Sequence, residues 1–371
     1  MASVQLNGLT KHYGEIKAVD DLTLTVHDGE FVVLAGPSGC GKTTILRMIA
    51  GLEKPSQGQV AIGEQVVNDL APQQRQVGMV FQGHAFYPHL TVQANMEFGF
   101  AGRKVSRAEV HAKVLETARL LQIEGLLERF PQELSGGERQ RVALGKTLAA
   151  DPQVWLLDEP FSHLDTNLRY TLRNELTRLR QQVGITTILV THDLSEAMSL
   201  ADRIAIVHHG QLLQCGTPAE IYDRPGSRLV AESWGLPPIN LLNAHLTQAA
   251  SNSVDVAVDN SPLRVTVHGN LEALTEGQSV TLGIRPEDVY VTKAGGNSPQ
   301  NGLPVTLVRV ERTGADALLH LQCGSLDLIA RAASRSVAEL SGDLRIDFDP
   351  QSIHLFDQDT GLRITQTATS T

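Results

Sequence analysis

The chain has 371 residues, which is enough for two domains with separate buried cores. Its 31 basic and 41 acidic residues give a net charge of −10, which argues against a general nucleic-acid or anionic-lipid binder. No apolar stretch approaches the roughly 18 residues needed to span a bilayer, and the N-terminal residues lack the apolar core of a secretory signal. We therefore expect a cytosolic chain that reaches a membrane only through a partner.

Apolar runs alternate with helical patterns from the N-terminus to about residue 233. The runs at 31–35, 154–157 and 186–190 are nearly uninterrupted, which is typical of parallel strands covered on both faces. Ser106 and Glu109 have the spacing of a capping box, which predicts the start of a helix. The alternation predicts an α/β domain with a mostly parallel sheet. A further helix is expected where leucines recur at helical spacing, at Leu164, Leu168, Leu172, Leu176 and Leu179.

The pattern changes after Pro237 and Pro238. Short alternating segments separated by Gly, Pro, Asn and Ser predict an all-β, barrel-like second domain. We place the boundary between residues 235 and 236, and we expect the polar tail from residue 358 onward to fray. The alternating segments are 253–258, 263–268, 279–284 and 303–310.

His208 and His209 invite a metal interpretation because they are adjacent histidines. They precede Gly210 and lie between two short apolar runs. A hairpin turn explains this arrangement better, so we assign the pair no chemistry.

Residues 36–43 match the phosphate-loop pattern G-x-x-x-x-G-K-[ST] between a predicted strand and a predicted helix. Glycines let successive N–H groups turn toward one anion, and the start of the helix adds a positive partial charge. Lys42 is expected to reach the β- and γ-phosphates and Thr43 to hold Mg²⁺. A glycine-rich turn that binds nothing would not explain this order of elements. The expected nucleotide contacts are Gly36, Pro37, Ser38, Gly39, Cys40, Gly41, Lys42, Thr43 and Thr44.

Asp158 and Glu159 follow the apolar run at 154–157. Ligands bind at the carboxyl ends of parallel strands, so both acids should face the phosphate loop. Asp158 is suited to hold Mg²⁺, and Glu159 to polarise the attacking water. A solvated strand end is the alternative explanation, but it does not account for the neighbouring phosphate loop.

Residues 134–140, Leu-Ser-Gly-Gly-Glu-Arg-Gln, form a second candidate anion site. Ser135 and Glu138 have capping-box spacing, and Gly136 and Gly137 expose N–H groups at a helix start. An ordinary helix cap would explain the first pair but not the glycines. This stretch resembles the signature motif of the ABC ATPases.

Other motifs of that family occur in the expected order. Gln82 resembles the Q-loop glutamine, residues 162–165 (Ser-His-Leu-Asp) the D-loop, and His192 the switch histidine, while Tyr13 stands where the family stacks an aromatic ring on adenine. The resemblance implies a RecA-like P-loop ATPase domain over residues 1–235, with a helical subdomain at about 86–150. It makes Glu159, His192 and Gln82 catalytic, and it adds Gln82 to Thr43 and Asp158 as a Mg²⁺ ligand.

The resemblance also implies a head-to-tail pair of ATPase domains. ATP on one phosphate loop would be sandwiched against Ser135, Gly136 and Gly137 of the other copy, with Asp165 nearby. We expect a homodimer, two transmembrane permease subunits and an extracytoplasmic solute-binding protein, with no nucleic-acid partner. The site would lie on the cytoplasmic face of a bacterial inner membrane.

The second domain resembles the OB-like accessory barrel of sugar-importer and polyamine-importer ATPases at residues 282–289. Residues 236–242 and 310–315 resemble the maltose-type sugar group. The implied function is ATP hydrolysis that drives uptake of a sugar, polyol or glycerol phosphate. The alternatives are an importer for another polar solute such as a polyamine, or a soluble ABC ATPase. The soluble families typically carry long coiled coils or two fused ATPase domains, and neither feature is present here.

Overall fold

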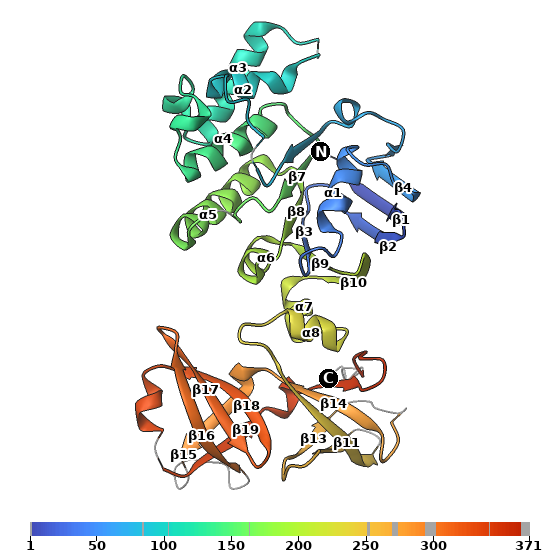
Figure 1. Cartoon of the computed structure of the whole chain (residues 1–371), viewed down its shortest axis with the longest axis vertical. Helices are drawn as coiled ribbons and strands as arrows, with labels where there is room; N and C mark the ends of the chain where they lie inside the picture. The colour runs from blue at the N-terminus through green and yellow to red at the C-terminus, as the bar shows by residue number, and fades with distance from the viewer. Residues whose placement is uncertain are drawn as a thin grey trace. The chain divides into compact units, whose positions relative to one another are not determined.

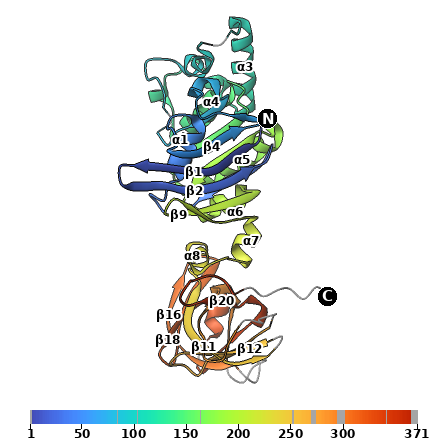
Figure 2. The same ribbon diagram turned by 90° about the vertical axis from the view of Figure 1, so that its right-hand side faces the viewer.

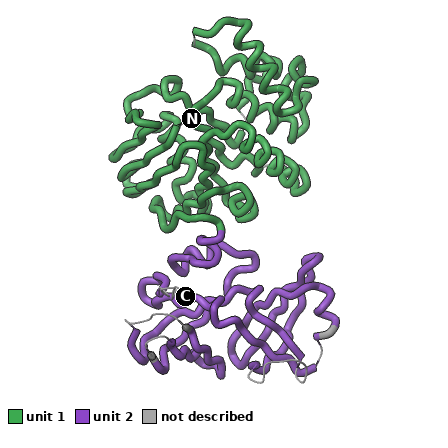
Figure 3. Tube along the Cα trace, turned by 180° about the vertical axis from the view of Figure 1, so that it is seen from behind, with its two compact units in different colours: residues 1–218 green, residues 219–371 purple. Residues whose placement is uncertain are grey.

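The computed structural model describes residues 2–83, 85–102, 104–162, 164–250, 253–268, 274–293, 302–340 and 342–364. It divides into two compact units, Met1–Pro218 and Ala219–Thr371 (Figure 3). The boundary expected at residues 235 and 236 lies inside the second unit, which also contains helix α8 (Arg228–Ser233). No helix in the described ranges is both long and apolar enough to cross a membrane.

A six-stranded sheet forms the centre of the first unit, in the order β10-β9-β3-β8-β7-β6. Neighbours from β9 to β6 pair in parallel, and only β10 pairs antiparallel. The three apolar runs are confirmed as β3, β7 and β8, whose residues are all buried. The strands are β3 (Phe31–Ala35), β6 (Val77–Val80), β7 (Val154–Asp158), β8 (Thr186–Thr191), β9 (Arg203–His208) and β10 (Gln211–Gly216).

Helices cover both faces of this sheet. Figure 1 shows α1 (Lys42–Ala50) on one side of the strands and α5 (Thr166–Val183) and α6 (Leu194–Leu200) on the other. The leucine spacing in the sequence is confirmed in α5, where Leu172, Leu176 and Leu179 are buried. The first leucine of the predicted stripe, Leu164, precedes the helix, which begins at Thr166.

A second, antiparallel sheet in the order β2-β1-β4-β5 lies beside the first and was not separated from it by the sequence pattern (Figure 2). Its inner residues share one apolar core with α1 and the central sheet. The phosphate-loop helix is therefore packed between two sheets. The strands are β1 (Val4–Tyr13), β2 (Ile16–Val26), β4 (Gln57–Ile62) and β5 (Gln65–Val66).

The chain between β6 and β7 carries three helices, α2 (Val92–Glu97), α3 (Arg107–Leu120) and α4 (Gly136–Leu148). The predicted capping box at the start of α3 is confirmed. Ser106 Oγ accepts the Glu109 N–H at 3.2 Å, and the Glu109 carboxylate accepts the Ser106 N–H at 2.9 Å.

The second unit contains two antiparallel five-stranded sheets, β13-β12-β11-β14-β20 and β15-β19-β16-β17-β18. Both contribute to one apolar core, which confirms the all-β expectation. Two short helices, α7 (Pro218–Asp223) and α8, precede the strands. The strands are β11 (Asn240–Ala250), β12 (Ser253–Val258), β13 (Arg264–His268), β14 (Ser279–Ile284), β15 (Val289–Lys293), β16 (Leu303–Arg312), β17 (Asp316–Cys323), β18 (Leu326–Ala333), β19 (Leu344–Phe348) and β20 (His354–Asp357).

The expectation that the chain frays from residue 358 is wrong for residues 358–364. Gly361 makes a turn with φ 67°, and the chain then folds back onto β20. The Ile364 N–H donates to Leu355 O at 2.8 Å and the Arg363 N–H to Gly226 O at 3.0 Å. These backbone hydrogen bonds hold a segment in place whose polar composition had predicted fraying.

Candidate functional site

The phosphate loop between β3 and α1 has a shape that only glycine allows at two positions. Gly36 has φ 148° and Gly41 has φ 107°. A Cβ on Gly36 would lie 2.1 Å from Val207 O, and one on Gly41 would lie 2.3 Å from Ala18 O. The loop is therefore enclosed by backbone of β9 and β2, and side chains at these positions would force it open.

The hairpin between β9 and β10 also closes the phosphate loop. The turn predicted from the sequence is confirmed, because His209 and Gly210 both have positive φ, 45° and 79°. The Gly210 N–H donates to Cys40 O at 3.0 Å, and Gly210 O accepts the Asp20 N–H at 3.0 Å. The turn thus braces the loop through backbone hydrogen bonds rather than through its imidazoles.

Lys42 is buried at the start of α1 and points back into the loop. Its Nζ donates to Gly36 O and Pro37 O, both at 2.8 Å, and lies 3.7 Å from Cys40 Sγ. Cys40 is itself buried. All three partners are neutral, so the ammonium charge is not balanced by a carboxylate among them. Together with the N–H groups at the helix start, it provides the positive charge that a phosphate requires.

Thr43 connects the loop to the end of β7. Its Oγ1 donates to Asp158 Oδ1 at 2.9 Å. Asp158 is only 6% exposed, and this burial raises the pKa of its carboxyl, against the lowering effect of the Thr43 hydrogen bond. A buried carboxylate beside a hydroxyl is a hard oxygen donor pair of the kind that binds Mg²⁺.

The described part of the chain has no group of three or more His, Cys, Asp or Glu side chains arranged to hold a metal. Mg²⁺ commonly takes one or two protein oxygens and completes its shell with water and phosphate. Thr43 and Asp158 therefore fit such an ion.

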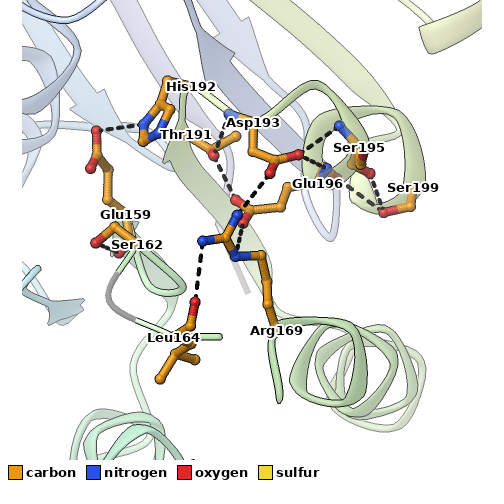
Figure 4. A network of polar contacts seen from close by, with 10 residues as sticks. All are labelled: Glu159, Ser162, Leu164, Arg169, Thr191, His192, Asp193, Ser195, Glu196 and Ser199. Carbon is orange, nitrogen blue, oxygen red and sulfur yellow. Dashed lines mark hydrogen bonds and ion pairs between the residues drawn. The ribbon is translucent and has the colours of Figure 1, made fainter. Parts of the chain in front are cut away.

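Glu159 meets the other two residues predicted to be catalytic. Its Oε2 accepts from Gln82 Nε2 at 3.1 Å. Its Oε1 lies 3.3 Å from His192 Nδ1, and Figure 4 shows this second contact. Its backbone has φ 44°, and its N–H donates to Val190 O at 3.0 Å. A positive φ in a residue with a side chain is a sparsely populated conformation that costs about 1–3 kcal/mol. The strained turn directs the carboxylate between Gln82 and His192.

The turn that carries His192 contains residues that sequence reasoning missed. Thr191 Oγ1 donates to Glu196 at 2.5 Å, and Arg169 Nη1 lies 3.1 Å from Asp193 Oδ2 (Figure 4). The spacing of Asp193 and Glu196 at the start of α6 is a signal that would have found the cap. Arg169 lies on α5, far away in sequence, so no local pattern indicates its contact.

The stretch at 134–140 forms the predicted cap of α4. Ser135 Oγ accepts the Glu138 N–H at 3.3 Å, and the Glu138 carboxylate accepts the Ser135 N–H at 2.8 Å. That backbone hydrogen bond lowers the pKa of Glu138. A Cβ on Gly137 would lie 2.8 Å from Leu168 Cδ1, so this glycine allows α4 to pack closely on α5. Gly136 has more space.

In the described chain no hydrogen bond joins Ser135, Gly136 or Gly137 to the phosphate loop. Asp165 caps its own helix, since it accepts the Leu168 N–H at 3.0 Å. Tyr13 ends β1 with 42% of its surface exposed, and Lys11 Nζ lies 4.9 Å from its ring centroid. His163, in the predicted D-loop, lies outside the described residues.

Comparison with protein families finds three matching models. They are described as ABC transporter over residues 19–162, MalK OB fold domain over 235–289 and TOBE domain over 282–356. The P-loop ATPase fold followed by an OB-like barrel is thereby confirmed.

Curated relatives match over nearly the whole length. The trehalose/maltose import ATP-binding protein MalK of Thermococcus litoralis is 45% identical over 377 residues, with 98% of this chain and 100% of the relative covered. The sn-glycerol-3-phosphate import ATP-binding protein UgpC of Ruegeria pomeroyi is 42% identical over 370 residues, with 99% and 100% covered.

A solved structure of a dimeric ATP-binding cassette, in a post-hydrolysis state with ADP and Pi, matches with a TM-score of 0.52 at 34% identity. The match covers 58% of this chain and 98% of that one. The chain therefore belongs to the ABC transporter family and is the ATP-hydrolysing, ATP-binding subunit of an importer.

Proposed function

We propose that this chain hydrolyses ATP to drive uptake of a carbohydrate or carbohydrate-like solute. The observation that carries the proposal is the contact of Glu159 with both Gln82 and His192, at the strand edge that also holds Thr43 and Asp158. The solute class is supported by relatives named for trehalose, maltose and sn-glycerol-3-phosphate. Their full-length matches do not favour a polyamine importer or a soluble ABC ATPase.

The phosphate loop would bind the triphosphate through its N–H groups and Lys42. In this role the ammonium exchanges the carbonyls of Gly36 and Pro37 for phosphate oxygens. Thr43, Asp158 and Gln82 would hold Mg²⁺, which neutralises phosphate charge when bound. The exposed ring of Tyr13 would stack on adenine.

Glu159 would polarise the water that attacks the γ-phosphate. Gln82 Nε2 donates to one of its oxygens and His192 Nδ1 lies 3.3 Å from the other, so both residues help to orient the carboxylate. Phosphoryl transfer is accelerated mainly by such positioning and by electrostatic stabilisation. His192 would contact the γ-phosphate, and Gln82 would transmit its presence toward the membrane subunits.

The working unit would be a homodimer. A second copy would place Ser135, Gly136, Gly137 and Asp165 against the nucleotide, and the dimeric cassette with ADP and Pi supports this arrangement. Two permease subunits and an extracytoplasmic solute-binding protein would complete the importer, with this chain on the cytoplasmic face. Residues 1–235 would form the ATPase domain, with a helical subdomain at about 86–150, and residues 236–371 the accessory barrel.

The Glu159→Gln variant tests the proposed chemistry. We expect hydrolysis to fall by about 10²–10⁴-fold, as for loss of a general base. Equilibrium binding of Mg·ATP should persist, and light scattering should detect an ATP-dependent dimer. Glu116→Gln, on an exposed part of α3, is the matched control. Near-normal turnover by Glu159→Gln would refute the assigned base.

A further inference from the structure

Arg169 connects the beginning of α5 to the turn that carries His192 (Figure 4). Its Nη2 donates to Leu164 O at 3.3 Å, in the segment that follows Glu159. Its Nη1 lies 3.1 Å from Asp193 Oδ2, and its Nε lies 3.9 Å from Glu196 Oε1. One guanidinium thus joins the two chain segments that supply Glu159 and His192.

Both residues adjacent to His192 are fixed by the same network. The Asp193 N–H donates to Thr191 Oγ1 at 3.0 Å, and Thr191 in turn donates to Glu196 at 2.5 Å. Asp193 Oδ1 also accepts the Ser195 and Glu196 N–H groups, at 2.8 and 3.1 Å. The backbone on each side of His192 is therefore held by hydrogen bonds that converge on Asp193 and Glu196.

The His192 side chain, in contrast, has little support of its own. It is 55% exposed, and its one described partner is Glu159 at 3.3 Å. Its position must come from its backbone. Glu196 is only 3% exposed, and burial raises the pKa of its carboxyl. Arg169 places a cation beside it, with Nε 3.9 Å from Glu196 Oε1. The planar guanidinium can serve Leu164 O, Asp193 and Glu196 together, which a lysine ammonium at the same place cannot.

We propose that Arg169 is a positioning residue for ATP hydrolysis, which holds His192 in register with Glu159 through Asp193 and Glu196. The inference rests on the proposed function, because it assumes that His192 acts on the bound nucleotide. Arg169 itself touches neither nucleotide nor water in this role. Its effect is on the rate of the chemical step, since misplacement of a reacting group by about 1 Å can cost about 10²-fold.

The first test compares Arg169→Met with Arg173→Met in the full-length chain. Arg173 lies one turn later on α5, and its guanidinium contacts the Tyr170 ring at 5.4 Å instead of the His192 turn. We expect kcat to fall about 10–100-fold in Arg169→Met, with little change in KM for ATP, and to be normal in Arg173→Met. Arg169→Lys should recover part of the rate, because it keeps a charge but not the planar fork. Rates are compared below the onset of unfolding, measured for each variant.

The second test is a double-mutant cycle with His192→Ala, measured by single-turnover hydrolysis. If Arg169 acts through His192, Arg169→Met should change the rate of His192→Ala by no more than about twofold. An equal loss in both backgrounds, or a normal kcat in Arg169→Met, would overturn the proposal. A normal rate in His192→Ala would remove the assigned role of His192, whereas the ATPase assignment is decided separately by Glu159→Gln.

Discussion

Lys42 in the first unit and Arg285 in the second are both buried cations with backbone carbonyls as partners. Lys42 in the phosphate loop donates to Gly36 O and Pro37 O, and it is 5% exposed. Arg285 in the second unit is 2% exposed and donates to Trp234 O and Tyr222 O, both at 2.6 Å. The two sites use the same chemistry, but their surroundings differ.

The guanidinium of Arg285 is buried between the Tyr222 ring and backbone carbonyls. Its Cζ lies 3.7 Å from the centroid of the Tyr222 ring, and the Tyr222 hydroxyl donates to Glu287. Lys42 is a compact charge on a flexible stem in a loop with no carboxylate among its partners. A buried cation alone therefore does not indicate a ligand site. A buried cation indicates a ligand site only where it can exchange its protein partners for atoms of a ligand.

The largest expected effect is a loss of stability when Arg285 is replaced. Arg285→Met leaves two buried carbonyls without a donor, at about 1–3 kcal/mol each, so the second unit should lose about 2–6 kcal/mol of stability. ATP binding should be unchanged. Hydrogen exchange measured by mass spectrometry resolves the two units, and Arg309→Met on the exposed part of β16 is the control. Equal protection in both variants would contradict a structural role.

At Lys42 the effect should appear in binding instead. Lys42→Met removes a charged hydrogen-bond donor from the triphosphate, which costs about 1.5–3 kcal/mol, or roughly 10–100-fold in Kd. Protection from hydrogen exchange without nucleotide should stay close to that of the unaltered chain, because Gly36 is only partly buried and Pro37 is exposed, so water can replace the lysine at their carbonyls. Titration with a fluorescent ATP analogue measures the change, and Lys17→Met, which removes an exposed lysine, is the control. An unchanged Kd for the ATP analogue would contradict a role of Lys42 in binding the triphosphate.

A smaller, pH-dependent effect should occur near Arg285. Burial lowers the pKa of His354 to about 3, and the charges of Arg363 and Arg285 add to this. Below pH 6.5 the His354 imidazole binds a proton in the unfolded state but not in the folded state. The free energy of unfolding is therefore highest above that pH and decreases as the pH falls. At pH 5 the loss should be about 2 kcal/mol.

The His354→Gln variant removes this titration and should remove that loss. Urea unfolding of the second unit, measured at pH 7 and at pH 5, checks the prediction. His245→Gln removes an exposed histidine of the same unit and should keep the loss. The same pH dependence in His354→Gln as in the unaltered chain would contradict it.

Sequence patterns predicted those parts of the fold that depend on neighbouring residues. The apolar runs of β3, β7 and β8, the caps at Ser106 and Ser135 and the phosphate loop all depend on spacing within about ten residues. The family resemblance indicated that Glu159 and His192 are both catalytic, but it did not predict their contact. Arg169 was missed because an arginine on an amphipathic helix looks solvated, and its partners lie on another element. The antiparallel sheet of β1, β2 and β4 was missed because β1 pairs with β4 across the intervening β3 and α1, so strands distant in the sequence form one sheet.

The turn between β9 and β10 affects how the phosphate loop of the first unit folds. The wall of the phosphate loop includes Val207 O and the Gly210 N–H, about 170 residues downstream of the motif that they enclose. A chain that ends at α6 contains every phosphate-loop residue. It lacks the backbone groups of β9 and the following turn that enclose the loop. We therefore expect a chain truncated before β9 to keep the phosphate-loop sequence but to lose the backbone groups that enclose it.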